Sequence, residues 1–382
     1  MPANLPAALL SRPAFAAAFD APAFVGAMLR FEAALAAAQA AEGLIPAAAA
    51  TAIEAACARV DIDVDALVAE GRRSASLAVP LVERLRAAVG DAHRAHVHFG
   101  ATSQDVLDTA MASCLKPCLE EADRALEATV RALVRRAREH RATPMLGRTL
   151  MQPALPITAG LRIARWATAL AQDRERLAEA QSVGLAVQLG GAVGALEALG
   201  DRGAAVRHRL ALALGLADAR AWHVHRNAWI DLLGRIAQVT LTTGKVARDL
   251  ALASQPEVGE MREAPADAGG RSSAMAHKRN PAGCALALAA ALRVPGLMSV
   301  IHSAAIAENE RALGGWQAEL ATVPDLAAAL GTSLDFLEQV GTSLVVDAAR
   351  MRSNLETYGG GAPPARLATD VDELLAELAP YA

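Results

Sequence analysis

The segment that most restricts the fold is WIDLLGRIAQVTLTTGKVARDLALA, at residues 229–253. Its bulky apolar side chains are spread around much of the circumference of the helix they would form, at Ile230, Leu233, Ile236, Val239, Leu241, Val246 and Leu250. A helix that is apolar on several sides is buried on several sides. The rest of the protein therefore has to surround this segment with other elements.

Several other segments have the same helical periodicity. From Met111 onward, apolar residues recur at steps of three and four, at Leu115, Leu119, Ala122, Leu126, Val130 and Leu133. This spacing predicts one long amphipathic helix that ends in an arginine-rich turn, as the helix dipole favours. Further long helices are predicted at about 155–181, 226–254 and 283–312. Because four or five such helices would struggle to bury their apolar surface alone, we expect other subunits to complete the bundle.

Composition favours an all-α fold. Hydrophobic residues make up 53% of the 382 residues, but aromatic residues only 3%. A core of Ala, Leu, Val and Ile suits closely packed helices better than a β-sandwich. We expect an amino-terminal helical domain over 1–110, a central long-helix domain over 111–353 and a reduced carboxy-terminal segment over 354–382. The glycines of 182–203 predict either a flexible connector or a close backbone approach to a ligand or helix.

Charge and patterning exclude several classes of protein. The formal net charge of −4 gives no basic surface of the kind that holds nucleic acid. The first residues, MPANLPAALLSRPAF, lack the basic region of a signal peptide. No uncharged apolar run reaches the roughly 20 residues that span a bilayer. We therefore expect a soluble cytoplasmic protein with neither nucleic acid nor a membrane as partner.

Cysteine and histidine spacing offers little support for a metal site. The four cysteines, Cys57, Cys114, Cys118 and Cys284, form neither a disulfide framework nor a paired CxxC pattern. The pairs His96/His98 and His223/His225 have spacing that can mark metal ligands, but nothing beside them supplies a third ligand. We predict buried cysteines, histidines that are structural or contact substrate, and no metal or other cofactor.

Three polar segments separate the predicted helices. The first, HVHFGATSQDVLDTA at 96–110, contains His98, Thr102 and Ser103. The second, GRTLMQPALPIT at 147–158, contains Arg148, Thr149 and Gln152. The third, GGRSSAMAHKRNP at 269–281, contains Ser272, Lys278 and Asn280. Each by itself is also consistent with helix capping, because Ser, Thr and Asp collect at helix starts.

Taken in this order, the three segments resemble the signature regions of the fumarase/aspartase superfamily, which includes argininosuccinate and adenylosuccinate lyases. SSAMAHKRNP resembles that family's SSxMPxKxNP signature. Within the superfamily the sequence is most similar to bacterial 3-carboxy-cis,cis-muconate cycloisomerases, over roughly residues 15–355. The stretches that carry this similarity are MLRFEAALAAAQAAEGLIP, VHFGATSQDVLDTA, GRTLMQPALPITAGL, QLGGAVGALEALGDRG and GKVARDLALASQPEVGEM.

The resemblance implies a helical homotetramer whose active sites are each built from three subunits, acting on a small polycarboxylate without a cofactor. It implies that Ser272 is the general acid/base, assisted by Lys278, because nearby N–H groups and a cation lower the proton affinity of a serine. The implied substrate contacts are His98, Thr102, Ser103, Arg148, Thr149, Gln152, Arg226, Asn280 and Arg311. Two alternatives stay open: His98 as a packed structural histidine, and Arg311 as a surface ion pair with Glu308 or Glu310.

The sequence also departs from the family's pattern. Leu150 follows GRT where lyases of the superfamily usually have a histidine that assists the leaving group. A carboxylate leaving group needs no proton, so Leu150 favours a lactonising cycloisomerase over a carbon–nitrogen lyase that releases fumarate. Arg271 and Ala276 stand where glycine and proline are expected, and the carboxy-terminal part is shorter than usual. These departures keep a third possibility open, a catalytically silent helical scaffold.

Overall fold

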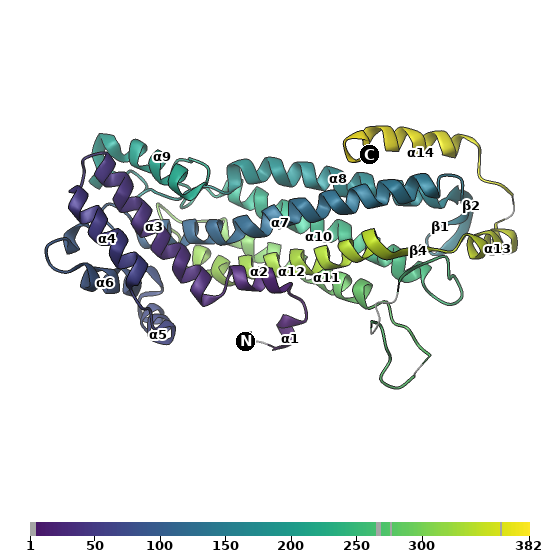
Figure 1. Ribbon diagram of the computed structural model, residues 1–382, viewed down its shortest axis with the longest axis horizontal. Coiled ribbons are helices and arrows are strands. Elements are labelled where there is room, and N and C mark those ends of the chain that lie inside the picture. The colour runs from purple at the N-terminus through teal and green to yellow at the C-terminus, as the bar shows by residue number, and fades with distance from the viewer. Residues whose placement is uncertain (1–4, 265–268, 276, 360) are drawn as a thin grey trace.

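The computed structural model describes residues 5–264, 269–275, 277–359 and 361–382. The molecule is an elongated bundle of long helices, with shorter helices gathered at both ends (Figure 1). The long helices are α7 (Ser103–Glu139), α8 (Ala159–Gly184), α10 (Asn227–Ala253), α11 (Ala282–Ala304) and α12 (Gly315–Ser343). The expected class, a mainly helical fold built on a long central bundle, is confirmed.

The boundaries of the long helices differ from the expected ones in three places. Helix α7 begins at Ser103 instead of Met111, because the side chain of Asp105 accepts a hydrogen bond from the backbone N–H of Thr102 and starts the helix earlier. The domain boundary placed at residue 110 therefore falls inside this helix. Helix α8 starts late because residues 152–158 form a strand, and α11 ends at Ala304.

Helix α12 was not predicted, although it packs against α7, α10 and α11. Pro324 lies inside it, and an internal proline normally argues for a break. Gly331 also lies inside it, and a Cβ there would come within 2.9 Å of the Phe15 ring. Packing against α2 therefore requires the glycine, which lowered the helical signal in the sequence.

The amino-terminal end is a layer of short helices around α3 (Ala21–Ala41), which packs on α4, α7 and α9. Its other members are α4 (Ala47–Arg59), α5 (Val64–Ser74), α6 (Ala78–Val89), the 3₁₀ turns η1 (Arg94–His96) and η2 (Glu197–Arg202), and α9 (Gly203–Leu214). The turn η2 and helix α9 thus come from a segment that follows α8, and the glycine-rich stretch brings the chain back to this end (Figure 1). Helices α1 (Leu5–Ala8) and α2 (Pro13–Ala18) lie nearer the middle of the bundle, where α2 packs on α7 and α12.

The opposite end carries two small antiparallel sheets. Strands β1 (Pro144–Thr149) and β2 (Gln152–Thr158) form a hairpin, and β3 (Met261–Glu263) pairs with β4 (Leu344–Val346). Helix α13 (Ala348–Tyr358) packs against β1. Helix α14 (Arg366–Glu377) and the turn η3 (Ala379–Tyr381) lie along α8 and α7, so the short helix expected after residue 354 is confirmed.

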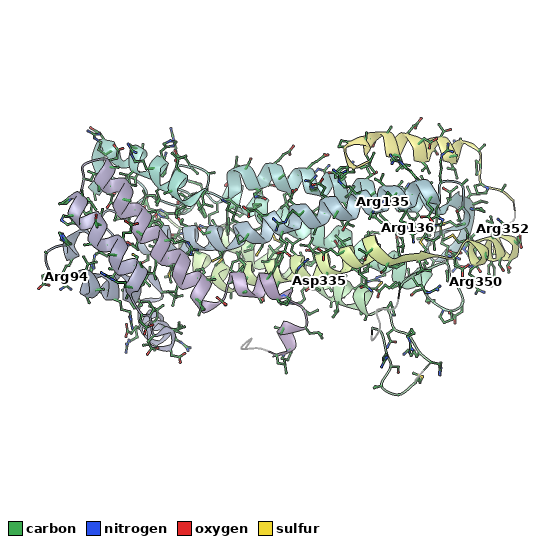
Figure 2. All side chains as sticks on the ribbon, in the orientation of Figure 1. Arg94, Arg135, Arg136, Asp335, Arg350 and Arg352 are labelled. Atoms are coloured by element: carbon green, nitrogen blue, oxygen red, sulfur yellow. The ribbon has the colours of Figure 1, made fainter. Side chains whose placement is uncertain are left out.

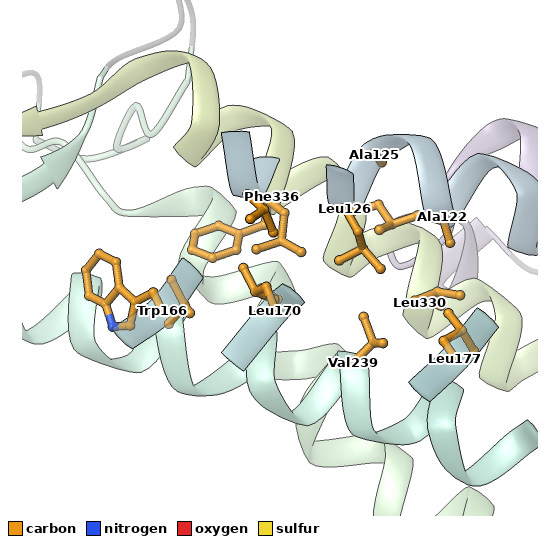
Figure 3. Close-up of a cluster of buried hydrophobic side chains, with 14 of the residues drawn as sticks. Ala122, Ala125, Leu126, Trp166, Leu170, Leu177, Val239, Leu330 and Phe336 are labelled. Atoms are coloured by element: carbon orange, nitrogen blue, oxygen red, sulfur yellow. The ribbon is translucent and has the colours of Figure 1, made fainter. Parts of the chain in front are cut away.

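The core of the bundle consists mainly of aliphatic side chains with few aromatic rings. Figure 3 shows part of it, where side chains of α7, α8, α10 and α12 meet; those labelled are Ala122, Ala125, Leu126, Trp166, Leu170, Leu177, Val239, Leu330 and Phe336. Small residues let the helices approach closely, since a Cβ on Gly244 of α10 would lie 2.5 Å from the Cβ of Ala291 on α11. Aliphatic and small residues therefore set the helix spacing, as the composition suggested.

Helix α11 leaves much of its apolar surface uncovered. By length and composition three helices are apolar enough to cross a membrane, namely Ala21–Ala41, Ala282–Ala304 and Gly315–Ser343, although no uncharged run of that length was found in the sequence. Leu292 of α11 is 72% exposed and Val300 is also exposed. Exposed apolar side chains of this kind are typical of surfaces that contact another molecule.

We expect Leu126→Ala to lower the free energy of unfolding by about 2–5 kcal/mol, because the side chain is fully buried and its loss leaves a cavity. The matched control is Leu212→Ala on the exposed face of α9, which should change it by less than about 0.5 kcal/mol. Urea denaturation followed by circular dichroism measures both. Equal losses would show that the core has been assigned wrongly.

Candidate active-site regions

The carboxylate of Asp105 organises the first polar segment. One oxygen accepts hydrogen bonds from the backbone N–H groups of Thr102 at 2.9 Å and Gly191 at 3.0 Å. The other accepts from Gly190 N–H at 2.9 Å and contacts His223 Nε2 at 2.7 Å. The buried charge is thus fully satisfied by hydrogen bonds. Asp105 fixes the start of α7 against the glycine-rich segment, which is in close backbone contact there and does not act as a flexible connector.

Arg311 reaches the same place from the segment between α11 and α12. Its Nη1 donates to Thr102 Oγ1, and its Nη2 donates to the carbonyl oxygens of Gly191 at 3.1 Å and Ala192 at 2.8 Å. Within the described residues its buried Nε has no hydrogen-bond partner. The alternative of an ion pair with Glu308 or Glu310 is not what the structure shows. Thr102 and Arg311 are therefore brought together as expected, in a cationic corner at a helix start.

His98 and Ser103 lie on either side of this corner. His98 Nδ1 is 2.6 Å from Oε1 of Glu32, a buried residue of α3. Burial disfavours the charged imidazole, but Glu32 and Asp105 outweigh it and raise the pKa of His98 above its usual value. Ser103 is the first residue of α7 and is half-buried. Both therefore lie close to Thr102, as the sequence predicted.

Arg226 does not lie in a position to hold a substrate. Its side chain is 2% exposed and forms ion pairs with Asp108 at 2.8 Å and Glu319 at 2.6 Å. Both terminal nitrogens and Nε donate to these two carboxylates, and the guanidinium also lies over the Trp222 ring. The expectation of a substrate contact is corrected, since Arg226 balances two buried charges that join α7, α10 and α12.

The second polar segment forms the β1–β2 hairpin. Arg148 donates two hydrogen bonds to the buried carboxylate of Glu260, at 2.8 and 2.9 Å, and Asn354 of α13 donates to the same carboxylate. This bidentate pair anchors the hairpin, and the Arg148 side chain, which is 24% exposed and lines a cavity with Thr149, remains an expected substrate contact. Thr149 and Gln152 face each other across the turn and are exposed.

The turn itself consists of Leu150 and Met151. Both have positive φ, 50° and 66°, which is unusual for residues other than glycine. Leu150 is 96% exposed. An apolar side chain presented to solvent on a strained turn is typical of a contact with another molecule.

The third polar segment extends from the bundle ahead of α11 (Figure 1). The two sides of this loop pair through their backbones. Arg271 and Arg279 form an isolated antiparallel β-bridge, and the N–H of Asn280 donates to the carbonyl oxygen of Gly270 at 2.7 Å. Ser272 Oγ accepts hydrogen bonds from the N–H groups of Ala274 at 3.3 Å and Met275 at 3.1 Å. The resemblance to the fumarase/aspartase superfamily implies N–H donors of this kind around Ser272. Lys278 and Asn280 are exposed, and Ala276 lies outside the described residues.

The three polar segments do not form one site within a single chain. Figure 2 labels Arg94, just ahead of the His98 segment, at one end of the molecule, and Arg350 and Arg352 at the other end. Arg350 donates to Val258 O, next to the Glu260 that holds the hairpin. The Ser272 segment leaves the bundle near that second end, where Asn280 lines a cavity of about 780 Å³ together with Arg262 and Gln339.

No group of three or more potential metal ligands occurs in the part of the chain that the structure describes. His223 of one HxH pair contacts Asp105, and His98 of the other contacts Glu32. The four cysteines are free; Cys114, Cys118 and Cys284 are buried and Cys57 is half-buried, which raises the pKa of their thiols. Three of the four cysteines are thus buried, as the sequence predicts, and both histidines are held by carboxylates of the helical bundle.

Sequence reasoning missed three acidic residues, namely Glu32, Asp105 and Glu260. Asp105 lies in the first polar segment, whose sequence is also consistent with simple helix capping, and Glu32 lies in an alanine-rich helix where charge is scarce. Each is fully buried. A lone acidic residue in an otherwise apolar helical face is the signal that could have identified Glu32, since acidic side chains are rarely buried without a partner.

A long helical bundle that carries a Ser-Ser-x-Met loop ahead of one core helix defines a class of helical lyases. The family model described as "Lyase" matches residues 11–296. The chain therefore belongs to this lyase family, whose structural neighbours have the fumarase/aspartase fold.

Individual relatives are more specific. The chain is 43% identical over 358 residues to a 3-carboxy-cis,cis-muconate cycloisomerase of Bradyrhizobium diazoefficiens, covering 93% of this chain and 79% of the relative. It is 40% identical over 378 residues to a nitrosuccinate lyase of Streptomyces davaonensis, covering 95% of this chain and 79% of that relative. The crystal structure of 3-carboxy-cis,cis-muconate lactonizing enzyme from Pseudomonas putida superposes with a TM-score of 0.85 at 38% identity, covering 92% of this chain and 79% of that one.

Replacing Arg226 tests its corrected role. We expect Arg226→Met to lower the free energy of unfolding by about 3–5 kcal/mol, because Asp108 and Glu319 then lose their buried counter-charge. Burial raises the pKa of Glu319 and Arg226 lowers it, so without Arg226 this carboxyl binds a proton more readily. The difference in the free energy of unfolding between Arg226→Met and the wild type should therefore shrink as the pH falls from 7 toward about 5.

The control for this experiment is Arg207→Met, which removes a more exposed ion pair with Asp218 and should cost less than about 1 kcal/mol. Denaturation at several pH values measures both variants. A substrate-binding Arg226 would give the opposite result, with stability unchanged and only the KM raised.

Proposed function

We propose that the chain is a cycloisomerase that converts 3-carboxy-cis,cis-muconate to 4-carboxymuconolactone. The observation that carries the proposal is the Ser272 hydroxyl oxygen, held by two backbone N–H groups inside a signature segment of a chain similar to such cycloisomerases. Hydrogen bonds to the oxygen stabilise its deprotonated form and so suit the serine to proton transfer.

The reaction is an internal addition without net oxidation. A carboxylate oxygen of the substrate forms a bond to an alkene carbon, and the displaced electron pair moves toward the neighbouring carboxylate as a doubly charged aci-carboxylate. Ser272 then delivers a proton to the carbon beside that carboxylate and is reprotonated from water. Every atom of the substrate is retained, so the step needs no cofactor, only fixed donors for the extra negative charge.

Two groups of side chains supply those donors. Thr102, Ser103 and His98 lie at the positive end of α7, and Arg311 adds a cation to the same corner. Lys278 and Asn280 are exposed in the same segment as Ser272. Thr149 and Gln152, on the exposed hairpin turn, contribute from a third side.

Leu150 narrows the choice of reaction. A lyase that expels an amine needs an acid to protonate the leaving nitrogen, and the exposed Leu150 cannot supply one. A leucine at this position is also compatible with a lyase whose leaving group is already a stable anion and needs no proton. The nitrosuccinate lyase relative makes nitrosuccinate the one alternative substrate that the assay should include.

The site is completed by further copies of the chain in a homotetramer. The Thr102 segment lies toward the end of the molecule that carries Arg94 in Figure 2, whereas the Ser272 segment leaves the bundle toward the end that carries α13 in Figure 1. The uncovered face of α11 and the exposed Leu150 provide apolar surface for such an assembly. Buried in this way, the shared site also loses water, which strengthens its charge interactions.

We expect Ser272→Ala to lower kcat for 3-carboxy-cis,cis-muconate by at least about a hundredfold, because the carbon then lacks its proton donor. Loss of the conjugated diene, followed by ultraviolet absorbance, measures the rate. Ser273→Ala is the matched control and should retain most of the activity, since its hydroxyl is exposed. Wild-type protein that is folded but leaves the diene intact would exclude this function, and nitrosuccinate would be assayed next.

Mixing two inactive variants tests the shared site. Ser272→Ala and Thr102→Val affect segments that are remote within one chain, so refolding them together should restore activity in sites that receive both intact segments. Sedimentation measures whether the mixture is tetrameric, and either variant refolded alone is the control. A tetramer without any recovered activity would show that each site is built from one chain.

A further inference from the structure

Glu32 forms a close pair with His98, and the reaction scheme assigns Glu32 no role. The two residues come from α3 and from the segment that precedes α7, and His98 Nδ1 lies 2.6 Å from Glu32 Oε1. The side chain of Glu32 is 0% exposed and that of His98 is 13% exposed. An isolated buried carboxylate is costly, so this contact is the charge compensation that allows Glu32 to be there.

The backbone around His98 is held in a strained shape. His98 has a φ of 61°, which costs free energy for a residue with a side chain. Gln39, also on α3, donates to the carbonyl oxygen of Phe99 at 2.5 Å. Gly100 has a φ of 70°, and Leu199 packs so closely that a Cβ there would lie 2.6 Å from it. Helix α3 and Leu199 thus hold the backbone that follows His98, and Glu32 of α3 contacts the ring itself.

The pairing leaves one ring nitrogen of His98 available. Nδ1 is directed to Glu32 Oε1, and this is the one side-chain hydrogen bond that His98 forms with the described residues. The charged groups that act on the ring are Glu32 of α3, Asp105 of α7 and Arg86 of α6. The two carboxylates favour the imidazolium and Arg86 opposes it. The ring therefore carries an N–H donor at Nε2, four residues ahead of the Thr102 that Arg311 contacts.

We propose that Glu32 is a positioning residue that orients His98, through Nδ1, so that Nε2–H donates a hydrogen bond to a carboxylate of the substrate. This inference rests on the proposed function only in that the ligand is a polycarboxylate. The Nδ1 proton stays shared with Glu32 throughout, and no proton leaves the pair during the reaction. A hydrogen bond from a cation to a carboxylate is stronger than one between neutral groups. Because Glu32 favours the imidazolium form of His98, it would strengthen the hydrogen bond from His98 to the substrate.

The first experiment measures the pair without turnover. Protein labelled with ¹⁵N and ¹³C in histidine is titrated by NMR, and citrate serves as a stable tricarboxylate ligand. Glu32→Gln should lower the pKa of His98, because burial remains while the largest favourable charge is lost. Citrate binding at neutral pH should weaken by roughly tenfold or more, and the loss should diminish at lower pH, where the ring is protonated without help.

Two further variants act as controls. Glu42→Gln removes a carboxylate at the other end of α3, where it pairs with Arg202 and Arg209, and should leave both His98 readouts unchanged. His98→Gln should weaken citrate binding as much as Glu32→Gln, and the double variant should be no weaker than His98→Gln, since the two residues act as one unit.

The outcomes separate this inference from the proposed function. If Glu32→Gln shifts the pKa of His98 and lowers stability but leaves the citrate affinity unchanged, Glu32 is only a structural counter-ion and the inference is wrong. It is equally wrong if citrate does not perturb the His98 ring signals of the wild type. If citrate binds as expected but the muconate is not turned over, the proposed reaction fails and the role of Glu32 stands.

Discussion

The amino-terminal half of the site depends on the buried carboxylate of Asp105. It joins the start of α7, the glycine-rich segment and His223 through three backbone N–H groups and one ring nitrogen. Glycine is required where two successive N–H groups converge on one side chain, and Gly191 has a φ of 71°. The carbonyl oxygen of Gly191 then accepts a hydrogen bond from Arg311. The cationic corner that we assign to substrate is therefore built on an internal anion.

Arginines in this protein serve two purposes that their sequence context does not distinguish. Arg226 and Arg148 are held by the carboxylates of Glu319 and Glu260, which are far away along the chain. Arg311 is held mainly by carbonyl oxygens, which leave its positive charge uncompensated. A guanidinium that pairs with a buried carboxylate stabilises the fold, whereas one that is bound only by neutral acceptors can still attract a substrate anion.

The separation of the polar segments has a physical reason as well as a functional one. Long helices keep their two ends apart, and α7 carries Thr102 at one end and the hairpin at the other. In the proposed homotetramer, copies of the bundle pack against one another and bring such distant ends together. The same arrangement leaves apolar residues of α11 and the Leu150 turn exposed, and their burial would stabilise that proposed assembly.

The sequence by itself determined the helical class, most of the long helices and the polar segments that matter, because apolar periodicity and capping chemistry are local properties of the chain. Only the tertiary structure decided that α12 runs through Pro324, that Arg226 is buried, and that Glu32 lies under His98. Those outcomes depend on contacts between residues far apart in sequence. Local pattern carries no information about which distant carboxylate neutralises a given cation, since that is fixed only when the helices pack.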